Sequence, residues 1–237
     1  DYSGIPASLD TKSVTFAADS AGAKVIVSPI GDTKMEPNET VRLRLEQGAG
    51  YVIGEASEAT GTILNDDLIG TSRNDIIAGT AVSEFLNGKR GRDTLSGGGP
   101  AADTFGFAFA ESQINAPDRI TDFQLGTDKL CILTASGLKL PAPVGLSSVS
   151  NGKAKTFRAL VSAAFLDCNG ALEGKQALGA NSAVIVKSLH KSISGTYLVV
   201  NDGVSALNYA NDLMINITGF TGDQAVSGSI PMSSIFL

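Results

Sequence analysis

The sequence predicts a mainly β protein built from three consecutive β-rich segments. Between Gly70 and Gly97 a glycine returns every nine residues, which is typical of a short stacked repeat. Before and after this ladder, apolar and polar residues alternate as they do in half-buried strands. Glycine is abundant and tryptophan is absent, a composition that favours turn-rich β architecture. We therefore divide the chain into residues 1–67, 68–106 and 107–237.

Composition bounds the functions that the chain can have. Of its 237 residues 43% are hydrophobic and 18% are charged, so it can bury a core. No run of eighteen apolar residues occurs, and we expect no membrane span. The net charge is −6 and no basic stripe is present, which argues against nucleic-acid binding. Because the chain has no nucleophile, metalloprotease or Walker motif and a single histidine, His190, we expect no enzymatic activity.

The first segment, residues 1–67, has the alternation of antiparallel strands. Four stretches carry it: SVTFAAD, AKVIVSPIG, VRLRLEQ and ATGTILNDD. The strings GDTKMEPNETVRLRL and ATGTILNDD resemble the second half of a Calx-β domain. That resemblance implies part of an antiparallel sandwich with a calcium site at one end. Its ligand positions fall on Asp1, Asp32, Glu36, Asp66 and Asp67. The alternative is that these acids only solvate loops at strand ends.

The Calx-β resemblance covers only the later strands of such a sandwich. An incomplete sheet exposes unpaired edges, which invite pairing with another chain. We therefore expect a partner chain to supply the missing strands, or cleavage to have removed them.

The second segment, residues 68–106, carries the nine-residue ladder. Its units read GTSRNDIIA, GTAVSEFLN and GKRGRDTLS, with an acid at the sixth position and an apolar residue at the eighth. A repeat this short cannot bury an apolar face alone, so it must stack on its neighbours. The acids that stacking aligns need a positive partner, and calcium takes six to eight oxygen ligands.

This ladder resembles the calcium-binding nonapeptide of RTX proteins. The resemblance implies a parallel β-roll in which two nonapeptides make one turn, so that alternate acids share an edge. On that geometry Asp75 pairs with Asp93, the stronger candidate site, and Glu84 pairs with Asp103. The second position departs from the family pattern, since it holds Thr71, Thr80 and Lys89 in place of glycine. The alternative is a small solenoid without ions.

The third segment, residues 107–237, begins with a cap for the roll. The string D-R-I-T-D-F-x-x-G-x-D-K-L, from residue 118 to 130, resembles the segment that closes RTX rolls. The resemblance adds Asp122 and Asp128 as candidate calcium ligands, whereas we expect Asp118 to cap a turn. The apolar residues expected to plug the open roll are Ile120, Phe123 and Leu130.

The rest of the third segment predicts one or two short helices and several strands. FRALVSAAFLD is a candidate helix, and AVIVKS, TYLVVND and LMINITGF are candidate strands. These strings are similar to the bluetail C-terminal domain of cyanobacterial surface proteins, which implies no catalytic role. Cys131 and Cys168 could form one disulfide or remain two buried free thiols, and the sequence leaves both open.

Together these features predict a non-catalytic, calcium-binding structural module of a secreted or cell-surface bacterial protein. It would fold and assemble outside the cell on calcium, after export without a Sec signal visible in this chain. A first alternative is the C-terminal export and stability tail of a larger secreted hydrolase that uses type I secretion. A second is a subunit of an extracellular fibre or surface layer, a homo-oligomer joined by strand addition.

Overall fold

A computed structural model describes residues 2–3, 14–15, 17–20, 22–29, 39–63, 67–222 and 230–237. The chain divides into two compact units, residues 1–66 and 67–237. Strands dominate both, which confirms the predicted mainly β class. In the described part of the chain, no helix has the length and apolar character needed to cross a membrane.

The first unit contains two small antiparallel sheets. Strand β1 (Tyr2–Ser3) pairs with β2 (Ser28–Pro29), and β3 (Glu39–Arg44) pairs with β4 (Glu58–Ile63). The last two correspond to the predicted strands VRLRLEQ and ATGTILNDD.

The two earlier strand predictions in this unit hold only in a small part. Strand β2 lies within the predicted stretch AKVIVSPIG, whereas residues 14–15, 17–20 and 22–27 form no strand. Among the described residues of these stretches, Ile26 is 59% exposed and so gains little from burial. Period-two spacing favours a strand only where one face is packed.

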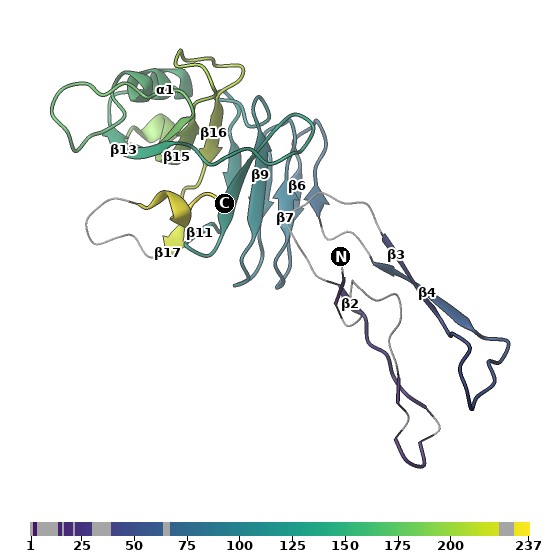
Figure 1. Cartoon of the computed structure of the whole chain (residues 1–237). Helices are drawn as coiled ribbons and strands as arrows, with labels where there is room; N and C mark the ends of the chain where they lie inside the picture. Colours follow the sequence, from purple (N-terminus) through teal and green to yellow (C-terminus); the bar gives the residue numbers. More distant parts are fainter. Residues whose placement is uncertain are drawn as a thin grey trace. The chain divides into compact units, whose positions relative to one another are not determined.

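The second unit begins with the predicted parallel roll (Figure 1). Successive nonapeptides place their strands alternately in two sheets, so each strand pairs with the strand two units away. One side is a four-stranded parallel sheet of β5 (Leu68–Ile69), β7 (Phe85–Asn87), β9 (Thr104–Ala108) and β12 (Lys129–Leu133). The other side begins with the parallel strands β6 (Ile76–Ala78), β8 (Thr94–Ser96) and β10 (Asp118–Ile120).

The second side of the roll continues into the C-terminal segment as one seven-stranded sheet. Its order is β13-β14-β15-β16-β10-β8-β6, and β16 joins β10 in parallel. The added strands are β13 (Gly145–Asn151), β14 (Ser182–Ser188), β15 (Gly195–Val200) and β16 (Leu213–Asn216). The last three confirm the predicted strands. A two-stranded pair, β11 (Gln124–Leu125) and β17 (Thr221–Gly222), lies beside the roll.

The α-helix α1 (Phe157–Leu166) packs on β13 and β14, and Figure 1 shows it beside β13. It is the predicted helix, and the Thr156 side chain caps it by accepting a hydrogen bond from the Ala159 amide at 3.2 Å. Two 3-10 turns, Lys191–Ile193 and Met232–Ser234, complete the elements of the described residues. After the second turn the chain returns to the roll, where the Leu237 amide donates to the Leu130 carbonyl at 3.1 Å.

Two apolar cores lie on opposite faces of the seven-stranded sheet. The first fills the roll, where Leu86 and Leu95, at the eighth position of their repeats, and Phe105, displaced by one extra residue, are fully buried. The predicted cap residues Ile120, Phe123 and Leu130 join this core. The second core lies under α1 and takes alternate residues of β14 and β15, among them Val184, Val186 and Val199. Cys131 and Cys168 are both buried free thiols, which decides between the two alternatives left open for them.

Candidate metal centre

The acids of the roll stand in two columns, because each acid directly precedes or opens a strand. In a parallel sheet such positions repeat at the same edge, one strand spacing apart. We call the acids that precede or open β6, β8 and β10 column A and those that precede β7, β9 and β12 column B. Column A is Asp75, Asp93 and Asp118; column B is Glu84, Asp103 and Asp128.

Within column A each carboxylate reaches the backbone of the preceding coil. The Asp75 amide donates to Asp93 Oδ1 at 2.8 Å, and the Asp93 amide donates to Asp118 Oδ1 at 2.8 Å. These charge-assisted bonds tie successive coils together at their edges. The structure thus brings together Asp75 and Asp93, as the sequence predicts, and adds Asp118 to them.

Column B repeats the arrangement on the other edge of the roll. The Glu84 amide donates to Asp103 Oδ1 at 3.0 Å, and the Asp103 amide donates to Asp128 Oδ1 at 3.1 Å. The Gln124 amide closes the far end by donating to Asp128 Oδ2 at 2.7 Å. The predicted pair of Glu84 and Asp103 is therefore also adjacent, with Asp128 below it.

Threonines at the second repeat position donate hydrogen bonds to the first acid of each column. Asp75 Oδ2 accepts hydrogen bonds from the Thr71 amide at 2.6 Å and the Thr71 hydroxyl at 2.8 Å. Glu84 accepts from the Thr80 amide at 2.6 Å and from the Thr80 hydroxyl at 3.0 Å. These two departures from the glycine pattern therefore supply hydroxyl donors to the acids four residues later.

The periodic glycines let the coils approach one another closely. A Cβ on Gly70 would come within 3.0 Å of the Gly88 carbonyl oxygen, and one on Gly79 would come as close to the Gly97 carbonyl. A Cβ on Gly88 or Gly97 would similarly collide with the carboxylate of its own repeat. Glycine therefore recurs every nine residues because the turn beside each acid has no space for a side chain.

Two carboxylate oxygens of the columns are buried without a hydrogen-bond partner. Among the described residues these are Asp93 Oδ2 and Asp118 Oδ2. The side chains are 1% and 0% exposed. At the end of column A, the Asp118 amide donates to the Ser112 hydroxyl at 2.8 Å, and that hydroxyl donates to the Met214 carbonyl at 2.7 Å. At this end of column A the Asp118 amide therefore bonds to the neutral hydroxyl of Ser112 and not to another carboxylate.

Burial and like charge raise the pKa values of the column acids. Desolvation is the main cause at Asp118, where the negative charges of Asp93 and Glu111 add to it and raise the pKa to about 7. Burial raises the pKa of Asp93 as well, with repulsion from Asp75 and Glu111. In column B, burial followed by the charges of Asp128 and Glu84 raises the pKa of Asp103 to about 6. Burial is also the main cause that raises the pKa of Asp128.

Asp118 corrects one expectation from the sequence. It does not cap a turn, because it is the first residue of β10 and its carboxylate serves the neighbouring coil. A signal for this was present: Asp118-Arg119-Ile120 repeats the acid-x-apolar pattern of Asp93-Thr94-Leu95. The two acids are 25 residues apart rather than 18, so a search at a fixed period misses this repeat.

Asp122 belongs to neither column. Its carboxylate accepts from the Ser96 hydroxyl at 2.7 Å and from the Gly97 and Gly98 amides at 3.1 and 2.9 Å. Burial opposes ionisation, but these hydrogen bonds outweigh it and lower the pKa of Asp122. The carboxylate therefore clamps the loop that follows β8.

The candidate ligands of the first unit fall mostly outside the described residues. Asp1, Asp32, Glu36 and Asp66 all lie there. Asp67 is described and half-buried, directly before β5. The predicted calcium site at the end of a Calx-β sandwich therefore stays a prediction.

The donor set of the columns suits a hard cation such as calcium, which binds carboxylate and carbonyl oxygens. The described residues contain no group of three or more His, Cys, Asp or Glu side chains that could hold a metal ion. A site in the columns would thus rest on pairs of carboxylates, completed by backbone carbonyls or water. The two buried, unpartnered oxygens of Asp93 and Asp118 fit that requirement.

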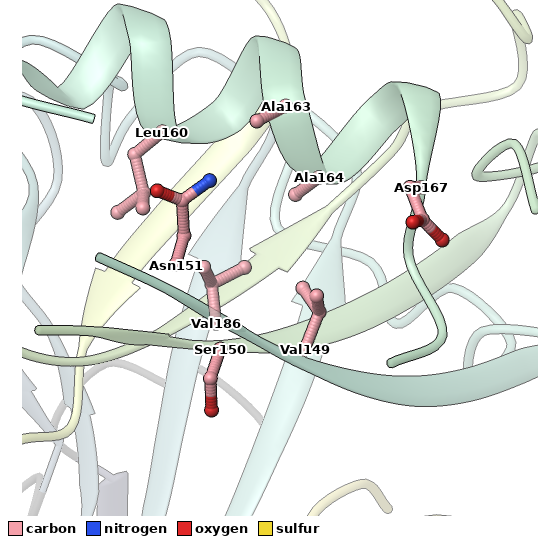
Figure 2. A pocket seen from close by; sticks show the side chains of 8 residues that line it. All are labelled: Val149, Ser150, Asn151, Leu160, Ala163, Ala164, Asp167 and Val186. Atoms are coloured by element: carbon pink, nitrogen blue, oxygen red, sulfur yellow. The ribbon is translucent and has the colours of Figure 1, made fainter. Parts of the chain in front are cut away.

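A cavity of about 200 Å³ lies between α1 and the sheet, away from the columns (Figure 2). Val149 and Asn151 point toward the helix and Ser150 points away from it. Asn151 Oδ1 already accepts from the Lys153 and Ala154 amides, each at 2.9 Å. The cavity is smaller than ordinary ligand pockets, and the Asn151 carbonyl oxygen in its lining is already bonded, so it is not a candidate site.

A comparison with protein families connects these features to a known domain. Residues 36–141, just under half of the chain, match the family model described as Peptidase M10 serralysin C terminal. The matched range includes β3, β4, both acid columns and the cap. No curated protein matches the chain.

Proposed function

We propose that this chain is a non-catalytic, calcium-binding structural module of a secreted or cell-surface bacterial protein. The observation that carries the proposal is the pair of buried carboxylate columns along a parallel roll. The family match supports it, because the serralysin C-terminal domain is the non-catalytic part of a secreted protease and belongs to the RTX-type calcium-binding proteins.

The columns give calcium a physical role in folding. Buried carboxylates at one strand spacing repel one another, and burial already raises the pKa values of Asp93, Asp103 and Asp118. A bound calcium ion would supply the positive charge that offsets this repulsion. Because the columns form only when the coils stack, a ligand for them stabilises the folded chain alone. The roll would therefore fold firmly where calcium is abundant, outside the cell.

A calcium titration tests this proposal directly. The metal-free chain is titrated with calcium while its circular dichroism and thermal midpoint are followed, and magnesium at equal ionic strength serves as the control. We expect calcium to raise the midpoint in a saturable manner and excess chelator to reverse the gain. Magnesium should do much less, because it demands a small octahedral site. A midpoint indifferent to both calcium and chelator would refute the proposal.

A further inference from the structure

We infer that the roll binds its divalent cation between Asp93 and Asp118. At the other pair of column A, Asp75 and Asp93, the hydrogen bonds from Thr71 to Asp75 take the place of a cation. The inference rests on the proposed calcium-binding function and names the site at which it acts. It differs from the sequence prediction, which favours the pair of Asp75 and Asp93.

The first step is an account of the carboxylate oxygens in column A. Asp75 Oδ2 has two donors from Thr71, and Asp93 Oδ1 has the Asp75 amide. Asp118 Oδ1 has the Asp93 amide. Asp93 Oδ2 and Asp118 Oδ2 have none, and both side chains are almost completely buried. A buried charged oxygen without a partner is costly, so these two atoms are the ones that require a cation.

The third repeat explains why no side chain fills this gap. Its second position holds Lys89, where the first two repeats hold Thr71 and Thr80. The Lys89 amide donates to Asn87 Oδ1 at 2.6 Å rather than to the acid of its own repeat. Asp93 therefore lacks the amide and hydroxyl donors that the first two acids receive.

The charge around the gap also favours a divalent cation. Glu111 repels both Asp93 and Asp118, and its side chain is only 14% exposed. The Lys89 ammonium lies 4.0 Å from Glu111 Oε1 and so balances one of these negative charges. The charges of Asp93 and Asp118 are not balanced in this way, and Asp75 adds a third negative charge in the same column, so the local charge favours a divalent cation.

Calorimetric titration of the full-length, metal-free chain with calcium tests the assignment. We expect Asp118→Asn to weaken calcium binding by at least about tenfold, because an amide replaces a charged ligand. The matched control is Asp75→Asn in the same column, which should leave the affinity within about threefold, less than the roughly tenfold cost of losing even an outer-shell partner. Equal loss in both variants, or a loss in Asp75→Asn alone, would overturn the inference. Absence of binding in the wild type would instead refute the proposed function.

A second measurement covers the case in which Asp118→Asn does not fold. Crystals of the wild-type chain grown with calcium would be examined by anomalous diffraction. A peak between the Asp93 and Asp118 carboxylates supports the assignment. A peak confined to Asp75 and Asp93 shows that Thr71 does not close that pair and contradicts it.

Discussion

The second position of the nonapeptide shows how one residue changes the needs of a neighbouring acid. Thr71 and Thr80 each donate an amide and a hydroxyl to the acid four residues later, whereas Lys89 does not. A hydroxyl at the second position partly replaces a cation, because it donates a hydrogen bond to a carboxylate oxygen. A departure from the repeat consensus can therefore mark an acid that does not need a bound metal ion.

Thr80→Val tests this role at the level of one hydroxyl group. Valine keeps the shape and the backbone donor but removes the hydroxyl that donates to Glu84 Oε1 at 3.0 Å and accepts from the Val82 amide at 3.5 Å. We expect the metal-free chain to lose about 0.5–1.5 kcal/mol of unfolding free energy, measured by urea denaturation. The control is Thr94→Val in β8, whose hydroxyl has no hydrogen bond in the described structure. Equal effects of the two variants would show that the Thr80 hydroxyl is not important.

At the scale of the element, the turn between coils sets the nine-residue period. Gly79 faces both the Gly97 carbonyl and the Glu84 carboxylate, so there is no space for a side chain. The backbone angle φ is positive at Gly91 and Gly98 but not at Gly70, Gly79, Gly88 or Gly97. Close approach, rather than left-handed backbone geometry, thus explains the periodic glycines.

Gly79→Ala should therefore destabilise the roll. The added methyl group would come within 3.0 Å of a backbone oxygen that cannot move without separating two coils. We expect a loss of about 1–3 kcal/mol, as for overpacked core sites, read from the midpoint of urea denaturation. The matched control is Gly145→Ala, where the new Cβ would meet its nearest neighbour at an ordinary 3.5 Å. A Gly79→Ala chain as stable as this control would rule out the steric explanation.

For the whole molecule, the buried acids couple stability to pH. Each raised pKa means that the folded chain holds its proton more tightly than the unfolded chain. The resulting stabilisation is complete below the ordinary pKa of 3.8 and is lost as pH rises through about 6 for Asp103 and about 7 for Asp118. Each pKa unit corresponds to about 1.4 kcal/mol.

The metal-free chain should accordingly have a higher thermal midpoint at pH 5 than at pH 8. Calorimetry in metal-free buffers across this range measures the trend. Asp118→Asn should flatten it, because the amide does not titrate. Saturating calcium should reverse the trend, because calcium requires the deprotonated carboxylates. A midpoint in metal-free buffer that rises from pH 5 to pH 8 would contradict the raised pKa values.

Several predictions about the whole chain stay predictions. They concern the Calx-β and bluetail identities, the boundaries at residues 67 and 106, and assembly into an oligomer or fibre. The structure adds one relevant fact, that the roll and the C-terminal segment share a seven-stranded sheet. Any boundary between them would therefore divide a continuous hydrogen-bonded sheet.

The sequence by itself determined the roll. A period of nine residues, with an apolar residue at the eighth position, places successive strands on two sides and buries Leu86 and Leu95 between them. It also aligned Asp75 with Asp93, 18 residues apart, and Glu84 with Asp103, 19 residues apart, because two repeats make one coil and the last unit carries one extra residue. The helix and the three later strands followed from local periodicity in the same way.

Only the tertiary structure decided which acids complete the columns and which oxygens lack a partner. Asp118 reaches Asp93 across 25 residues rather than the 18 that separate Asp75 from Asp93, and β16 joins β10 in parallel from far along the sequence. Such contacts depend on how the loops close, and a fixed period does not encode loop closure. The accounting of carboxylate oxygens, which moves the candidate cation from Asp75–Asp93 to Asp93–Asp118, depends on those contacts.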